Sequence, residues 1–240
     1  MLQVRDLCCG YRDITVLRDI NFEIEEGETL ALVGSNGAGK TTLLMSISGH
    51  ISPNSGKIIM NGADLASKGP DKRCVLGVGL VPEGRRIFPD LTVFENLKAI
   101  AEIKIDNRSY REEKINSLIS KFELDSIRDI KADFLSGGQK KKLVIAIALI
   151  SDPKILLLDE PFAALDVMTI KTLQEIIVDL QRLNNISVIL CDHQARDLLA
   201  CVDTAAIIHN GKVVAQGTPT SLIQNIDARN AYFGDSFKIS

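Results

Sequence analysis

The feature that most constrains this chain is a glycine-rich segment between Leu30 and Leu43. An apolar run from Leu30 to Val33 leads directly into the spacing G-x-x-x-x-G-K-T, which occupies Gly34 to Thr41. A buried strand, a tight turn and a following helix together point backbone N–H groups and the positive end of the helix dipole at one place. This order predicts a loop that binds the phosphates of a nucleoside triphosphate, rather than a turn that only connects two elements.

Two side chains at the end of this loop supply its chemistry. Lys40 can reach the terminal phosphates, and the Thr41 hydroxyl can ligate Mg²⁺. The residues expected to bind the nucleoside triphosphate through the loop are Gly34, Ser35, Asn36, Gly37, Ala38, Gly39, Lys40, Thr41 and Thr42.

Length, charge and cysteine content limit the remaining possibilities. The chain has 240 residues and a formal net charge of −3, so it can bury a large core and is not suited to bulk nucleic-acid binding. No apolar run approaches the roughly 20 residues needed to span a bilayer, and the N-terminus is unlike a signal peptide. The five cysteines form no C-x-x-C pair, which indicates free, mostly buried thiols in a reducing compartment.

Hydrophobic periodicity predicts an α/β chain. Residues 2–33 alternate as short strands do, and Asn61 and Gly62 indicate a tight turn after another strand. Residues 92–130 have helical periods without a convincing strand, with Thr92 as the expected N-cap and Glu95 completing a capping box. This helical stretch divides two strand-rich regions.

A second apolar run, from Ile155 to Leu158, ends in Asp159 and Glu160, as a central parallel strand would. A phosphate loop needs a carboxylate on a neighbouring strand to position Mg²⁺, and Asp159 fits this role. Glu160 can then polarise the attacking water. An ordinary acidic pair at a strand end is the weaker interpretation because the phosphate loop lies upstream.

A second anion site is predicted at Leu135 to Gln139, where Ser136, Gly137 and Gly138 begin a helix. One γ-phosphate does not need two such anion-binding sites from the same chain. We therefore interpret this segment as closing on a nucleotide that another copy holds.

Together these segments resemble the ATP-binding cassettes of ABC transporters across nearly the whole chain. Gly34 to Thr42 match the Walker A motif, Leu135 to Gln139 the family signature, and Ile155 to Glu160 Walker B with its catalytic glutamate. Three further matches are Tyr11 to the base-stacking aromatic residue, Asp166 to the D-loop and His193 to the switch histidine, which contacts the γ-phosphate.

The resemblance implies a P-loop NTPase core with a mostly parallel sheet, an antiparallel β subdomain and an inserted helical subdomain. Residues 1–240 would form one nucleotide-binding domain, with the core and β subdomain over 1–85 and 152–240 and the helical subdomain over about 90–150. It further implies that two cassettes enclose two ATP and Mg²⁺, with Ser136, Gly137, Gly138 and Gln139 facing the partner's ATP.

The implied partners are a second cassette subunit, integral membrane permease subunits and, in the wider system, a solute-binding protein, without nucleic acid. The chain would be cytoplasmic and peripheral on the inner face of the cell membrane. Ile87 and Phe88 are candidates for contact with the permease, and packing into the chain's own core is the equal alternative.

Two positions depart from the family pattern. Glu83 stands where the family commonly has Gln; its carboxylate could still ligate Mg²⁺, but it adds negative charge near the phosphates. Ile147 stands where many members have Arg, so the ion pair that such an Arg would make is missing.

Different segments of the chain resemble different branches of the family. The uptake cassettes for branched-chain amino acids, which we favour slightly, are resembled by Asn36 to Ala38 and by residues 81–97. The lipopolysaccharide-export ATPase is resembled by Lys140 to Lys142, Glu160 to Ala163, Asp192-His193 and the ending Tyr232 to Ile239. The run Lys140 to Lys142 is interpreted as a solvated helix face, the other interpretation being contact with lipid headgroups or an acidic partner.

Two alternative functions outside membrane transport are also considered. A soluble cassette that acts on DNA or ribosomes usually has paired cassettes or a long insert, whereas this chain has one signature and a short insert. The second alternative is a nucleotide sensor that binds ATP without hydrolysing it. The presence of Glu160 and His193, which an ATPase needs, argues against this function.

Overall fold

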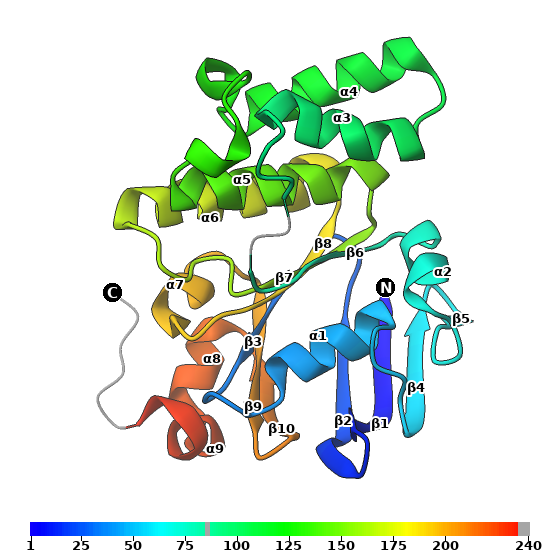
Figure 1. The fold of residues 1–240 in the computed structure, drawn as a ribbon. Helices are drawn as coiled ribbons and strands as arrows, with labels where there is room; N and C mark the ends of the chain where they lie inside the picture. The colour runs from blue at the N-terminus through cyan, green and yellow to red at the C-terminus, as the bar shows by residue number, and fades with distance from the viewer. Residues whose placement is uncertain (85–86, 235–240) are drawn as a thin grey trace.

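A computed structural model describes residues 1–84 and 87–234 and shows two sheets in one half of the molecule with a stack of helices on the other (Figure 1). Arg85, Arg86 and residues 235–239, which are part of the segments that resemble the two family branches, lie outside the described residues. The described part contains no helix long and apolar enough to cross a membrane.

The larger sheet has the strand order β10-β9-β3-β8-β7-β6 and is parallel except for the antiparallel pair of β9 and β10. Its strands are β3 (Thr29–Val33), β6 (Val78–Val81), β7 (Ile155–Asp159), β8 (Ser187–Cys191), β9 (Thr204–His209) and β10 (Lys212–Gly217). The smaller sheet is antiparallel, in the order β2-β1-β4-β5. Its strands are β1 (Leu2–Tyr11), β2 (Ile14–Ile24), β4 (Ser55–Met60) and β5 (Ala63–Asp64).

The helices are α1 (Lys40–Ser48), α2 (Pro70–Val75), α3 (Val93–Lys104), α4 (Arg108–Lys121), α5 (Gly137–Ala148), α6 (Val167–Asn184), α7 (Ala195–Leu199), α8 (Pro219–Gln224) and α9 (Ile226–Ala228). Helices α3 to α6 form the stack in one half of the molecule, and α1, α2, α8 and α9 lie beside the sheets (Figure 1). The predicted α/β fold with a parallel sheet, an antiparallel sheet and a helical stretch is confirmed. The capping box of Thr92 and Glu95 at the start of α3 is confirmed as well.

The continuous apolar runs of the sequence are explained by burial on both faces of the large sheet. In β3, Leu30 and Leu32 pack into the core that the two sheets share with α1, whereas Ala31 and Val33 pack into the core beneath the helices. Successive strand residues point to opposite faces, so a strand covered on both sides must be apolar throughout. Each leucine buried in this way contributes about 2 kcal/mol of transfer free energy.

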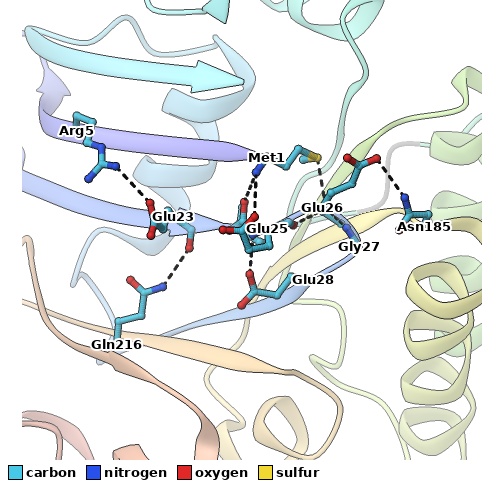
Figure 2. Close-up of polar contacts among 11 residues, drawn as sticks. Met1, Arg5, Glu23, Glu25, Glu26, Gly27, Glu28, Asn185 and Gln216 are labelled. Carbon is cyan, nitrogen blue, oxygen red and sulfur yellow. Dashed lines mark hydrogen bonds and ion pairs between the residues drawn. The ribbon is translucent and has the colours of Figure 1, made fainter. Parts of the chain in front are cut away.

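The two sheets meet beside the acidic turn that joins β2 to β3 (Figure 2). The Met1 ammonium donates to the Ile24 carbonyl at 2.9 Å, and the Asn185 amide donates to Glu26 Oε1 at 3.1 Å. The Gln216 amide in β10 donates to the Glu23 carbonyl in β2 at 3.1 Å. These contacts bring segments far apart in the sequence together, and the bond from Gln216 to Glu23 joins the small sheet to the large one.

The carboxyl ends of the parallel strands lie at one edge of the large sheet, where ligands of open α/β sheets commonly bind. The phosphate loop follows β3, Glu83 follows β6, and Asp159 ends β7. The strand of Asp159 is not hydrogen-bonded to β3 itself, because β8 lies between them: Cys191 is in register with both Leu32 and Asp159. Strand order of this kind is set by tertiary packing and leaves no local signal in the sequence.

All five cysteines are free thiols, as expected. Burial, with a smaller contribution from Asp197, raises the pKa of the Cys201 thiol to about 12. Between the ordinary thiol pKa of 9.0 and this value, the unfolded chain releases a proton that the folded chain retains, so the free energy of unfolding falls as pH rises.

In this pH range, we expect ionisation of Cys201 to lower the free energy of unfolding by about 1.4 kcal/mol per pH unit. Urea unfolding of the wild-type protein and of Cys201→Ala between pH 8 and 10.5 measures it, and the variant should show the shallower dependence. Equal slopes for the two proteins would contradict the assignment, whatever the difference in their absolute stability.

Candidate nucleotide-binding site

Two glycines of the phosphate loop adopt backbone conformations that other residues rarely adopt. Gly37 and Gly39 adopt left-handed conformations, with φ of 78° and 109°. A Cβ added at Gly37 would meet no atom within 4 Å, so this glycine serves the turn and leaves open space above it. A Cβ at Gly34 would lie 2.3 Å from the Ile208 carbonyl oxygen, so here the loop packs directly on β9. The loop is therefore both tightly seated and open toward a ligand.

Lys40 is buried and folds back over the loop that precedes it. Its Nζ donates to the carbonyl oxygens of Gly34 at 2.7 Å and Ser35 at 3.1 Å. An ammonium held in this way lies directly against the backbone of the loop. Phosphate oxygens would offer it stronger, charge-assisted acceptors than these carbonyls.

The structure brings two of the three predicted Mg²⁺ ligands, Thr41 and Asp159, together. Thr41 Oγ1 donates to Asp159 Oδ1 at 3.2 Å, and Cys191 Sγ donates to the same oxygen at 2.9 Å. Asp159 Oδ2 is buried without a hydrogen-bond partner among the residues that the structure describes. A buried carboxylate oxygen without a partner is costly unless something binds it, so this atom fits a cation.

The character of this donor set suits Mg²⁺. No group of three or more His, Cys, Asp or Glu side chains that could hold a metal occurs in the described part of the chain. Mg²⁺ usually takes one or two protein oxygens and completes its shell with water and substrate phosphates. Thr41 and Asp159 are the residues that would hold it.

A cavity of about 410 Å³ joins the phosphate loop to the end of β7. Its walls are formed by Val16, Asn36, Gly37, Gly39, Lys40, Thr41, Thr42, Asp159 and Glu160. Val16 was not predicted, since one valine in a strand carries no sign of a ligand. Tyr11 is 51% exposed at the end of β1 and does not line the cavity, so its stacking on a base stays a prediction.

Glu160 lines this cavity in an unusual backbone conformation. Its φ is 50°, in the left-handed region, and its N–H donates to the Cys191 carbonyl at 2.7 Å. Burial and then the nearby Glu83 carboxylate raise the pKa of Glu160 above its ordinary value of 4.5. A carboxylate with a raised pKa is a stronger base, as proton abstraction from water requires. Glu83 therefore lies close enough to act on Glu160, but it does not line the cavity, and its ligation of Mg²⁺ stays a prediction.

The predicted solvated face of Lys140 to Lys142 is wrong. Lys140 is buried and donates to the Asp133 carbonyl at 2.8 Å, and Lys141 donates to the Glu160 carbonyl at 2.5 Å. Lys142 forms an ion pair with Glu123 at 2.6 Å. The three side chains leave α5 in different directions and find three different partners, which a run of like charges in the sequence cannot indicate.

The signature segment caps α5. The Ser136 hydroxyl accepts the Gln139 N–H at 3.2 Å, and Gln139 Oε1 accepts the Ser136 N–H at 2.8 Å. This capping box satisfies two N–H groups of the first turn. None of Ser136, Gly137, Gly138 and Gln139 lines the cavity at the phosphate loop, which is the arrangement expected if they face another copy.

The signature and the predicted D-loop are linked through Thr169. A Cβ added at Gly138 would lie 2.6 Å from Thr169 Cγ2, so α5 and α6 touch at this glycine. Thr169 Oγ1 in turn donates to Asp166 Oδ2 at 2.6 Å, and Asp166 caps α6. A larger residue at position 138 would therefore disturb Asp166 as well.

His193 lies apart from the phosphate loop. Its side chain is half-exposed, with Nδ1 3.2 Å from Asp192 Oδ1, and it lines a separate cavity with Tyr232. The carboxylate of Asp192 is buried and accepts the Phe162 N–H at 2.8 Å. His193 still lies close enough to lower the pKa of Glu160, but its contact with a γ-phosphate stays a prediction.

Three predicted residues outside the cavity differ in their packing. Ile87 is partly buried against the core beneath the helices, whereas Phe88 is exposed. Ile147, at the position where many family members have Arg, packs against the same core.

Comparison with known proteins shows which family this chain resembles. Residues 17–163 match the family model described as ABC transporter. An uncharacterized ABC transporter ATP-binding protein of Rhizobium meliloti is 37% identical over 238 residues, covering 99% of this chain and 88% of that protein. The lipopolysaccharide export system ATP-binding protein LptB of Haemophilus influenzae is 36% identical over 240 residues, covering 100% and 99%.

Solved structures show the same fold. The cbiO1 protein of Clostridium perfringens, part of the ABC transporter complex cbiONQ, has a TM-score of 0.86 at 27% identity and covers 95% of this chain and 92% of its own. An ATP-binding subunit of an ABC transporter has a TM-score of 0.81 at 31% identity, covering 97% and 95%.

Proposed function

This chain belongs to the ABC transporter family of ATPases, and we propose that it is the subunit that hydrolyses ATP to drive a membrane permease. The observation that carries the proposal is the single cavity in which Lys40, Thr41, Asp159 and Glu160 converge. The 3.2 Å contact of Thr41 with Asp159 joins the phosphate loop to the acidic strand end, two features that the sequence separates by 118 positions.

Each of these residues has one role in the proposed reaction. Lys40 and the loop N–H groups hold the phosphates, while Thr41 and Asp159 would hold Mg²⁺, which neutralises developing phosphate charge when bound. Glu160 accepts the proton of the water that attacks the γ-phosphate. The remaining catalytic power comes from positioning rather than from covalent chemistry.

We infer that the active form is a dimer in which Ser136 to Gln139 of one copy close on the ATP of the other. Three large apolar side chains next to the signature and the D-loop support this arrangement. Phe134, Val167 and Met168 are 78%, 69% and 71% exposed, at helix starts that the contact of Gly138 with Thr169 brings together. Exposed apolar groups gathered in this way are typical of a surface that a partner covers.

We further propose that residues 90–150 act as a helical subdomain that meets the permease, with the chain on the cytoplasmic face of the membrane. Relatives named LptB, similar over the whole chain, support a lipopolysaccharide-export type of system. A branched-chain amino acid uptake system is the second candidate, supported by the sequence of residues 81–97, and would include a solute-binding protein.

Two measurements on the same preparation test the proposed function. The tagged chain is purified from detergent-treated membranes of its own cells, co-purifying proteins are identified, and phosphate release from ATP is followed. We expect permease subunits and steady phosphate release. Ribosomes or DNA in place of permease subunits would indicate a soluble cassette, and ATP binding without phosphate release would indicate a sensor.

A further inference from the structure

The main chain of Glu160 is fixed from both sides by hydrogen bonds to distant segments. Its N–H donates to the Cys191 carbonyl of β8 at 2.7 Å, and its carbonyl oxygen accepts Lys141 Nζ of α5 at 2.5 Å. A left-handed conformation costs a residue other than glycine about 1 kcal/mol or more and persists only where the surroundings impose it. These two bonds help to hold Glu160 in this conformation.

Lys141 also brings a positive charge into a strongly acidic environment. The side chain is half-buried, and burial lowers the pKa of its ammonium while four nearby carboxylates raise it again. These carboxylates belong to Asp192, Glu160, Asp159 and Glu83. A bound triphosphate would add further negative charge, so a cation at this place reduces repulsion that Glu83 in particular increases.

We propose that Lys141 is a positioning residue of the hydrolytic site, which fixes the main chain of Glu160 from the signature helix and offsets the charge of Glu83. The proposal rests on the proposed function, since it assigns a role in ATP hydrolysis. Lys141 lies two positions after Gln139, so a displacement of the signature helix would act on the main chain of Glu160 through this bond.

The first test compares three single variants by steady-state kinetics. Lys141→Met removes both the donor and the charge, and we expect kcat to fall about tenfold while KM for ATP changes less than about threefold. Lys141→Arg retains donor and charge and should remain within about threefold of wild type. Lys142→Met, which loses only the ion pair with Glu123, is the matched control and should keep the wild-type kcat.

The second test measures coupling to Glu83. Glu83→Gln is introduced into the wild-type protein and into Lys141→Met, and kcat/KM is compared across the four proteins. We expect Glu83→Gln to restore part of the activity that Lys141→Met loses, giving a non-additive cycle. Strict additivity would overturn the proposed charge compensation.

Further outcomes separate the proposals. A wild-type protein without ATP hydrolysis would overturn the proposed function itself. An active wild-type protein with an equally active Lys141→Met variant would overturn only the role of Lys141, as would an Arg variant as impaired as the Met variant. Thermal unfolding checks that each variant folds, and Lys141→Gln replaces Lys141→Met if the latter does not.

Discussion

Glu160→Gln is expected to lower the rate of ATP hydrolysis by about a hundredfold or more, since it removes the general base and leaves the cavity nearly unchanged in shape. The amide cannot accept the proton of the attacking water. Glu160 touches no phosphate-loop residue by a hydrogen bond in the described structure, so ATP binding should persist. Single-turnover phosphate release and equilibrium binding of a fluorescent ATP analogue measure the two effects separately.

The control for this variant is Glu112→Gln, which changes the same chemical group in the exposed ion pair with Arg108. It should hydrolyse ATP at the wild-type rate, because surface pairs of this kind contribute little. Steady ATPase activity in Glu160→Gln would show that another group activates the water.

Lys40→Ala is expected to weaken ATP binding about tenfold to a hundredfold and to abolish measurable hydrolysis. A hydrogen bond to a charged group contributes about 1.5–3 kcal/mol, and 1.4 kcal/mol corresponds to about a tenfold change in affinity. Loss of the buried ammonium also removes positive charge where the γ-phosphate would lie. Equilibrium binding of the fluorescent ATP analogue, with and without Mg²⁺, gives the magnitude.

Lys98→Ala is the matched control for this loss of a lysine. Lys98 pairs with Glu102 one helical turn away on the exposed face of α3, at 3.8 Å, so its removal should leave binding unchanged. Equal affinity of Lys40→Ala and wild type for the analogue would contradict the assigned role of the phosphate loop.

The phosphate loop could be predicted from the sequence because its chemistry is local. The strand, the glycines at fixed offsets, Lys40 and Thr41 lie within a dozen positions, and short-range backbone geometry decides their arrangement. The same holds for the capping box of Ser136 and Gln139, although that pattern alone does not reveal which molecule it faces.

The features that sequence reasoning missed depend on packing between distant segments. Insertion of β8 between β3 and β7 places Cys191 against Asp159, and no periodicity of either strand encodes that order. In the sequence, Lys141 is one of three adjacent like charges. Only the packing of α5 in the fold brings its side chain to the main chain of Glu160. Val16 lines the cavity because the small sheet docks beside the loop, a contact made across the fold.

The central claim is that two chains complete each ATP site, and mixing two inactive variants tests it most directly. Lys40→Ala disables the phosphate loop, and Ser136→Arg, at an exposed position, blocks the signature; each alone should be inactive. In an equal mixture, the mixed dimer contains one intact site, so activity should return to at most about a quarter of the wild-type value with random pairing. A mixture that forms mixed dimers and stays inactive would contradict the claim.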